Sequence, residues 1–370
     1  METMIALFKK EKVLLIALAL ALLSMLLTPP DAGYLDYIDL RTLALLFCLM
    51  LLVKGFQGVG LFDWLIGKAF GRVKTLRRLC VMLVLLCFFT SMVITNDVAL
   101  ITFVPFAMLA LQLCGQEAHL ILVVVLQTIA ANLGSMATPI GNPQNLYLFS
   151  MSGMPIATFF GTMLPLTALS LLLILLATLA FPREPIHMAL PAQQSAMPRR
   201  ELIAYMALFL LNLLVVFRVL NWSVALVITV AGVLLMRKAS LLKQVDWALL
   251  LTFVGFFVFV GNLGRVDAIS AWLQRALEGR EVLLSALMSQ ALSNVPAALL
   301  LSGFTENYPA LLAGVNIGGL GTLIASMASL ISYKFYASRP DARRGRYLAV
   351  FTVYNVAGLV ILLLFRYLIA

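Results

Sequence analysis

Two apolar stretches with polar centres limit what this chain can fold into more than any other feature of its sequence. They cover residues 79–114 and 283–304. Their centres consist of hydroxyl, amide and carboxyl side chains, namely Ser91, Thr95, Asn96 and Asp97 in the first stretch and Ser289, Gln290, Ser293 and Asn294 in the second. Polar groups in the middle of a segment long enough to cross a bilayer are costly to bury, so they indicate a functional site.

A glycine-rich segment follows each stretch, at residues 132–145 and 316–327. The two halves of the chain align where polar residues are hardest to explain. Ser91, Thr95 and Asn96 match Ser289, Ser293 and Asn294, and Asn132, Gly134 and Thr138 match Asn316, Gly318 and Thr322. An internal repeat with polar, helix-breaking centres in a hydrophobic chain is typical of the binding site of a secondary transporter.

The composition of the chain excludes a soluble globular protein. Hydrophobic residues make up 63% of the chain and charged residues 11%, whereas soluble domains carry about 45–50% and 25%. Apolar runs near the length that crosses a bilayer, about 20 residues, recur from end to end. The sequence therefore predicts an all-α polytopic membrane protein. Its net charge of +10 comes from basic loops, which orient membrane proteins, so we expect contact with membrane lipid and no binding of nucleic acid.

Two repeats and one linker account for the whole chain. The first repeat covers residues 1–181, and residues 201–370 hold a linking span and the second repeat. The proline-rich residues 182–200 form a cytoplasmic linker. In each repeat we expect a re-entrant helical hairpin followed by a broken transmembrane helix, at about 79–112 and 119–149 in the first repeat and about 283–304 and 309–332 in the second.

The distribution of basic loops gives the two repeats opposite orientations. If basic loops lie in the cytoplasm, the charge count is consistent only when both hairpins return to the side from which they start. The first hairpin then enters from the cytoplasm and the second from outside, with the N-terminus in the cytoplasm and the C-terminus outside. Lysines before the apolar residues 13–27 imitate a signal peptide, but no small-residue cleavage site follows, so we expect an uncleaved first span.

The polar residues of both repeats suit a hard monovalent cation. Ser91 and Thr95 lie on one helical face, and a helix unwound at glycine or proline exposes carbonyl oxygens that can coordinate such an ion. We expect coupling to sodium ions or protons through the following positions: Ser91, Thr95, Asn96, Asp97, Asn132, Gly134, Ser289, Ser293, Asn294, Asn316 and Gly318. Transition metals prefer imidazole and thiolate ligands, so we expect no transition-metal site and no cofactor.

A second, overlapping set of polar residues is predicted to bind substrate. It consists of Asn96, Thr138, Asn142, Asn145, Asn294, Thr322 and Ser326. Those in the broken helices either line the pocket or only cap half-helices, whose N-termini present amide groups to an anion. For any single residue of either set, ordinary helix packing in a membrane is the simpler explanation. The duplication of the whole set favours a site.

Asp97 requires a separate interpretation, because a carboxylate at membrane depth costs about 2.5 kcal/mol or more. Such a residue is functional by default, and proton relay or cation coordination is its usual role. The alternative is a neutral acid that supports the hairpin tip. The second repeat has Val295 at the equivalent position, so the hairpin does not need a carboxylate as such. This asymmetry favours a role in coupling.

These motifs resemble those of the ion transporter superfamily, especially its citrate-transporter-like and arsenite-permease/NhaD-type branches and the sodium-coupled dicarboxylate carriers. The resemblance covers nearly the whole chain. The dicarboxylate carriers place a Ser-Asn-Thr motif at each hairpin tip, with another hydroxyl four residues earlier, as in Ser91-x-x-x-Thr95-Asn96 and Ser289-x-x-x-Ser293-Asn294. The resemblance implies a homodimer whose scaffold holds a mobile transport domain that moves as an elevator. The amphipathic segments 61–76 and 263–281 would be the arms that join the two domains.

At the third motif position the chain departs from the dicarboxylate carriers, which have substrate-binding threonines where Asp97 and Val295 stand here. This looks more like the arsenite-permease/NhaD branch, in which an Asn-Asp pair is usual. We predict a secondary active transporter of the bacterial inner membrane that moves a small carboxylate or oxyanion, coupled to sodium ions or protons.

The alternative is a cation/proton antiporter or a metalloid efflux permease that uses Asp97 as its exchanging carboxylate. A channel would need a continuous polar pore, whereas the polar residues gather at two tips. An intramembrane aspartyl protease would need two carboxylates that share a proton. The chain is therefore not expected to be an enzyme.

Overall fold

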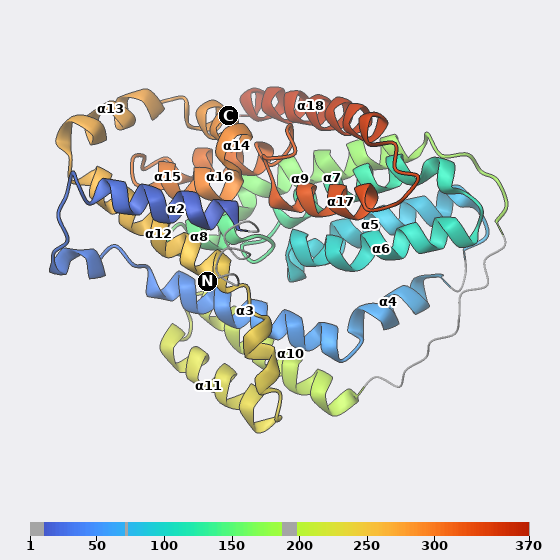
Figure 1. The fold of residues 1–370 in the computed structure, drawn as a ribbon, viewed down its shortest axis with the longest axis horizontal. Coiled ribbons are helices and arrows are strands. Elements are labelled where there is room, and N and C mark those ends of the chain that lie inside the picture. The colour runs from blue at the N-terminus through green and yellow to red at the C-terminus, as the bar shows by residue number, and fades with distance from the viewer. Residues whose placement is uncertain (1–10, 71–72, 187–197, 370) are drawn as a thin grey trace.

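The computed structural model describes residues 11–70, 73–186 and 198–369 (Figure 1). These residues form helices, joined by loops and one isolated β-bridge between Thr75 and Pro185. The α-helices of the first half are α2 (Lys12–Ser24), α3 (Leu40–Gly58), α4 (Leu61–Phe70), α5 (Leu76–Ile94), α6 (Asn96–Leu113), α7 (Leu120–Ser135), α8 (Pro143–Ser152) and α9 (Ile156–Thr178). Those of the second half are α10 (Arg199–Val216), α11 (Trp222–Leu235), α12 (Trp247–Gly264), α13 (Asp267–Leu277), α14 (Glu281–Leu292), α15 (Asn294–Ser302), α16 (Tyr308–Ile317), α17 (Met327–Ala337) and α18 (Arg344–Leu368).

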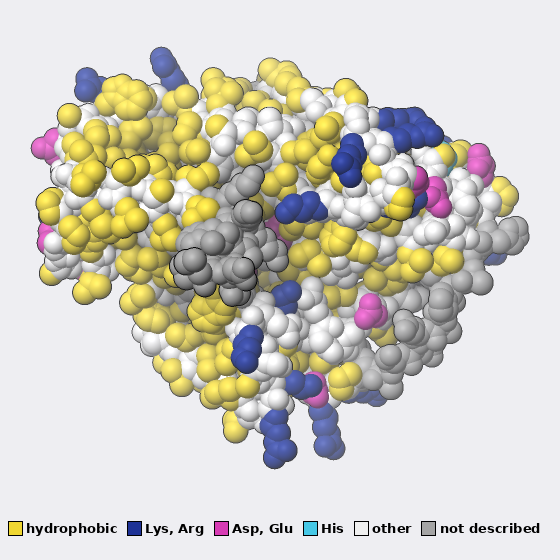
Figure 2. All heavy atoms as spheres, viewed as in Figure 1, with side chains coloured by type: hydrophobic (Ala, Val, Ile, Leu, Met, Phe, Trp, Pro, Cys, Tyr) yellow, Lys and Arg dark blue, Asp and Glu magenta, His cyan; other side chains and the backbone are white. Residues whose placement is uncertain are grey.

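Six helices in the described part of the chain are long and apolar enough to cross a membrane. They are α5, α6, α7 with the short 3-10 turn before it, α9, α12 and α18. The segments 32–58 and 61–68 form one further candidate, a span bent by 57°. Many large apolar side chains stay exposed, among them Leu364 on α18 at 66%, and Figure 2 shows hydrophobic atoms spread over the visible face. The prediction of an all-helical multi-span membrane protein is confirmed.

The helices pack in two groups. In the first group α2 packs on α12, and α10 and α11 pack on α3. The second group contains α5 to α9 and α14 to α18, and its helices from both halves of the chain contact one another. Arg218, in the loop between α10 and α11, links the groups by donating hydrogen bonds to the carbonyl oxygens of Phe149 and Gly153 at the end of α8, at 3.0 and 2.6 Å.

Each predicted hairpin consists of two helices separated by a single non-helical residue, which is Thr95 in the first and Ser293 in the second. Helices α14 and α15 have 12 and 9 residues, so they extend about 18 and 14 Å. The hydrocarbon core of a bilayer is about 30 Å thick, and neither helix can cross it alone. Helices α5 and α6 have 19 and 18 residues, which would suffice, so re-entry of the first hairpin stays a prediction.

Breaks in the two predicted broken helices fall in the glycine-rich segments. Residues 136–142 separate α7 from α8, and residues 318–326 separate α16 from α17. Packing is mirrored between the halves, because α6 contacts α17 as α15 contacts α8, and α2 contacts α12 as α11 contacts α3. This exchange of partners is the packing that a two-fold relation between two repeats would produce. The domain boundaries and the opposite orientation of the repeats stay predictions.

Candidate transport site

Both hairpin tips have the same unusual backbone. Thr95 has φ 73° and ψ 151°, and Ser293 has φ 78° and ψ 155°. Residues other than glycine rarely adopt a positive φ, and each such residue costs of order 1–3 kcal/mol unless its surroundings hold it there. The same strained conformation at equivalent positions of both halves indicates a functional constraint, because a turn between two helices can be built without strain.

Two glycines let the broken helices approach the hairpins closely. A Cβ atom on Gly134 would lie 2.1 Å from the carbonyl oxygen of Phe88 and 2.7 Å from the Ser91 hydroxyl. A Cβ atom on Gly318 would lie 2.8 Å from the Ser289 hydroxyl. Only glycine fits at both positions. The hydroxyl four residues before each tip therefore lies against the backbone of the broken helix from the same half.

A network of hydrogen bonds around Asn132 joins the first hairpin to the second half of the chain. Asn132 lies at the end of α7 and is 5% exposed. Its side-chain oxygen accepts hydrogen bonds from the Asn96 amide and from the Ser326 hydroxyl, both at 3.0 Å. Its side-chain nitrogen lies 3.4 Å from the Gly319 carbonyl oxygen and from the Ser329 hydroxyl. The first tip is thus connected to the start of α17.

Asn316, the equivalent of Asn132, makes the mirror-image connections. Its side-chain oxygen accepts a hydrogen bond from the Asn142 amide at 3.1 Å. Its side-chain nitrogen donates to the side-chain oxygen of Asn145 at 2.6 Å. Asn142 and Asn145 occupy the positions after the first break that Ser326 and Ser329 occupy after the second. Each central asparagine therefore has side-chain partners across the boundary between the two halves, Ser326 and Ser329 for Asn132, and Asn142 and Asn145 for Asn316.

Two threonines in the breaks bind their own hairpins in the same way. The Thr138 hydroxyl donates to the Met92 carbonyl oxygen, and the Thr322 hydroxyl donates to the Gln290 carbonyl oxygen at 3.1 Å. In both cases the acceptor lies three residues before the tip. The structure thus places the aligned polar residues of the two halves in one pseudo-symmetric polar core.

The second tip is held by hydrogen bonds that the first tip lacks. The Asn294 backbone N–H donates to the Ala325 carbonyl oxygen at 2.9 Å, and the Gln290 side chain donates to the Gly318 and Leu320 carbonyl oxygens, both at 2.9 Å. Its oxygen also accepts from the Thr322 N–H. Within the described residues, neither the Thr95 hydroxyl nor the Asp97 carboxylate makes a hydrogen bond or an ion pair.

Four helix N-termini meet at this polar core. Helices α6 and α15 begin at the tips, with Asn96 and Asn294 as their first residues. Helix α8 begins after Asn142, which accepts a hydrogen bond from the Asn145 N–H, and α17 begins after Ser326. Each helix N-terminus carries roughly half a positive charge. Helices α5, α7, α14 and α16 end at the core and contribute carbonyl ends of opposite sign.

The predicted site residues differ in accessibility. Asn132, Asn142, Asn145, Asn316 and Ser326 are buried and hydrogen-bonded to one another or to nearby groups. Thr322 is exposed, and Thr95, Asp97 and Thr138 are partly exposed. Their roles in binding stay predictions.

Gln290 and Ser329 belong to the polar core although they were not among the predicted site residues. Gln290 was recognised only as a polar residue of the second stretch, and its bonds to the broken helix depend on folding. Ser329 carries a signal that the repeat contains, because it aligns with Asn145 when the match between Asn132 and Asn316 is extended.

An all-helical, multi-span fold with broken helices that meet in a polar core is that of a membrane transporter. The model of the citrate transporter family (CitMHS) matches residues 3–309, and the chain belongs to this family. The resemblance to the ion transporter superfamily is thereby confirmed, as is the expectation that the protein is a transporter and no enzyme.

Two proteins of similar sequence and one solved structure can be compared with this chain. The chain is 32% identical to an uncharacterized transporter of Methanocaldococcus jannaschii over 326 residues, which cover 88% of each protein. It is 35% identical to the inner membrane protein YbiR of Escherichia coli over 307 residues, with 82% of this chain and 81% of YbiR covered. The crystal structure of the YdaH transporter of Alcanivorax borkumensis matches with a TM-score of 0.59 at 17% identity, covering 93% of this chain and 87% of that one. This likeness concerns the fold alone.

Proposed function

We propose that the protein is a secondary active transporter that moves a small anion, a carboxylate or an oxyanion, in exchange for or together with sodium ions or protons. The observation that carries this proposal is the convergence of four helix N-termini and four helix C-termini on one polar core. The N-terminal amides favour an anion, and the carbonyl ends favour a cation. Membership of the citrate transporter family supports an anionic substrate.

The coupling ion and the anion use different subsets of the predicted residues in this proposal. Coupling ions bind near the hydroxyls of Ser91 and Ser289, where the broken helices pass closest. The anion binds nearer to the accessible groups Thr138 and Thr322, with Asn96 and Asn294 between the two sites. The buried asparagines hold the half-helices in place, so their contribution to substrate binding is indirect.

Movement of the site across the bilayer follows the predicted elevator. The transport domain consists of the two hairpins, the two broken helices and the helices packed on them, and α2, α3 and α10 to α12 form the scaffold of a homodimer. Helices α4 and α13 are the arms. The inner membrane is the proposed location, which is where the name of YbiR places that relative.

A cation/proton antiporter or a metalloid efflux permease is the second candidate. The observation that favours it is Asp97, a carboxylate at the first tip that makes no hydrogen bond or ion pair with any described residue. An acid in this position would repel a dicarboxylate when it is ionised. It is well placed to exchange a proton for a cation.

Thermal unfolding of the purified protein separates the candidates. We would measure it in sodium, potassium and choline salts at two pH values, with and without citrate, succinate, phosphate and arsenite, because a ligand of the folded state raises the melting temperature. Stabilisation by sodium that deepens with one anion supports a sodium-coupled anion carrier. A melting temperature that depends on pH and on a cation but on no anion, and that loses this dependence in Asp97→Asn, supports the antiporter. If no salt, pH or anion has an effect, both proposals fail.

A further inference from the structure

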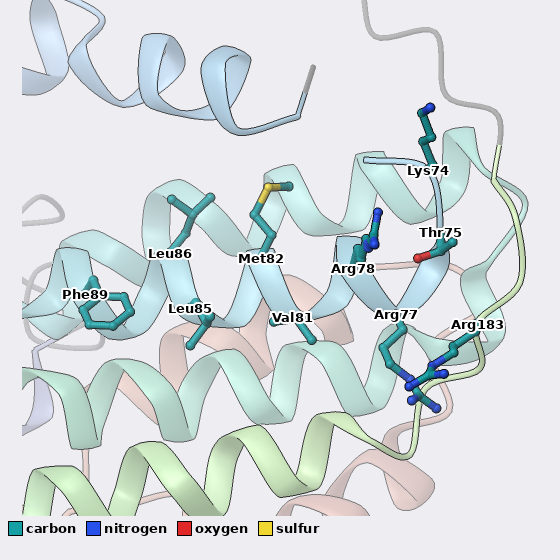
Figure 3. Close-up of a pocket in the computed structure, with 10 residues that line it drawn as sticks. All are labelled: Lys74, Thr75, Arg77, Arg78, Val81, Met82, Leu85, Leu86, Phe89 and Arg183. Carbon is teal, nitrogen blue, oxygen red and sulfur yellow. The ribbon is translucent and has the colours of Figure 1, made fainter. Parts of the chain in front are cut away.

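A groove of about 990 Å³ runs along one face of α5, outside the polar core (Figure 3). One end is basic and is lined by Lys74, Thr75, Arg77, Arg78 and Arg183. The rest is apolar and is lined by five residues of α5, namely Val81, Met82, Leu85, Leu86 and Phe89. Such a combination of cations and an apolar wall has no role in the proposed transport cycle.

Two backbone hydrogen bonds join the two segments that carry the cations of the groove. The Leu76 N–H donates to the Glu184 carbonyl oxygen at 2.9 Å, and the Ile186 N–H donates to the Lys74 carbonyl oxygen at 3.1 Å. This pairing holds the segment after α9 against the start of α5. As a result, Arg183 lies beside Arg77 on one side of the start of α5, whereas Lys74 lies on the opposite side with Arg78 between them (Figure 3).

Three of the four cations have no partner of their own. Arg77 is occupied, because it donates to the carbonyl oxygens of Phe181 and Leu179 at 2.6 and 3.0 Å. The side chains of Lys74, Arg78 and Arg183 make no hydrogen bond or ion pair within the described residues, and all three are exposed. The carboxylate nearest in sequence, Glu184, faces Gln116 at 3.5 Å. The end of the groove is therefore positively charged without compensation.

The apolar wall has the dimensions of one lipid leaflet. Its residues recur at helical spacing from Arg78 to Phe89, a distance of about 16 Å along the helix. Half of the hydrocarbon core of a bilayer is about 15 Å thick. Phe89, at the far end, is 51% exposed. A ligand with an anionic head and an acyl chain would place its phosphate among the cations and its chain along α5.

We propose that an anionic phospholipid binds in this groove, with its headgroup at the basic end, in the field of Lys74, Arg78 and Arg183, and one acyl chain against Val81 and Leu85. A free phosphate would use the basic end and leave the apolar wall uncovered. The lipid would bridge the base of the first hairpin and the end of α9.

Native mass spectrometry of the full chain tests this proposal. The protein, released from detergent, would be titrated with dioleoyl phosphatidylglycerol or with dioleoyl phosphatidylcholine. We expect one tightly bound phosphatidylglycerol per chain and at least tenfold weaker binding of phosphatidylcholine. The triple variant Lys74→Gln/Arg78→Gln/Arg183→Gln should lower the affinity for phosphatidylglycerol roughly a hundredfold, because each basic residue near an anionic headgroup contributes about fivefold.

Two further variants make the test specific. Arg237→Gln/Lys243→Gln/Arg346→Gln removes the same number of exposed charges elsewhere and should leave the affinity unchanged. Val81→Trp fills the groove without changing its charge and should weaken binding of the lipid at least tenfold. The proposal is overturned if the control triple variant loses as much affinity as the groove variant. It is also overturned if Val81→Trp has no effect, or if inorganic phosphate alone displaces the lipid.

Discussion

The two hairpin tips share one backbone conformation and a hydrogen bond from a threonine of the following break, yet they differ in how firmly they are held. The second tip is fastened to its broken helix by Asn294 and by the side chain of Gln290. The first has Met92 in place of Gln290 and carries the unpaired Asp97. The same arrangement of backbone and polar residues thus serves both tips, whereas differences at single positions set how firmly each tip is held. Hydrogen bonds brace the second tip, and the first carries a group that can change its charge.

Adding a methyl group at the closest contacts should have the largest effect. In Gly134→Ala the new Cβ would meet the Phe88 carbonyl oxygen at 2.1 Å, and in Gly318→Ala it would meet the Ala286 Cα at 2.8 Å. Overpacking costs about 1–3 kcal/mol and occasionally more, so Gly134→Ala should unfold at the lower temperature of the two and transport nothing. Gly161→Ala, where nothing lies within 4 Å, is the control. Equal melting temperatures for all three variants would contradict the packing of the core.

Removing the central amides should have the next largest effect, and it should be equal in the two halves. Asn132→Ala leaves the Asn96 amide without its acceptor, and Asn316→Ala leaves the side-chain oxygen of Asn145 without its donor. A buried polar group without a partner costs about 1–3 kcal/mol. Thermal unfolding of both single variants and the double variant measures this. A loss confined to one half would show that the mirrored network is not an energetic unit.

Exchanging the residues three positions before the tips would sharpen the comparison. Gln290→Met gives the second tip the residue of the first and removes the hydrogen bonds to Gly318, Leu320 and Thr322. We expect it to destabilise the protein by about 1–3 kcal/mol and to speed hydrogen exchange of the backbone around residues 318–326. The reciprocal variant, Met92→Gln, should have little effect on stability. If both variants behave alike, the second tip is not the braced one.

Asp97→Asn should change stability least, because the carboxylate has no partner to lose among the residues that the structure describes. Its effect should appear in the pH dependence of transport, measured as uptake into proteoliposomes over a pH series. Asparagine cannot release a proton, so uptake should become independent of pH where the native protein responds to it. The variant Val295→Asp serves as the control for a new acid near a tip and should not restore that response. An unchanged pH profile in Asp97→Asn would remove Asp97 from coupling.

The positions of the helix breaks were predictable, because the two halves of the chain carry matching polar residues there. The break at Thr95 and the break at Ser293 follow from hydroxyl and amide side chains inside apolar stretches, and the unwound segments follow from glycines. Hydrogen bonds across the halves were not predictable, since Asn132 is distant in sequence from Ser326 and only folding brings them together. The starts of α5 and α14 were also missed, because these helices begin before the apolar stretches and include charged residues, Arg77 and Arg78 in α5 and Glu281 in α14.

The crossed hydrogen bonds of Asn132 and Asn316 have a consequence for biosynthesis. While the second half is still on the ribosome, the amide of Asn132 has none of its partners at Ser326, Ser329 or Gly319, and the first broken helix must wait with exposed polar groups in the bilayer. The hydrogen bonds of the polar core are therefore complete only once both halves of the chain are in the membrane.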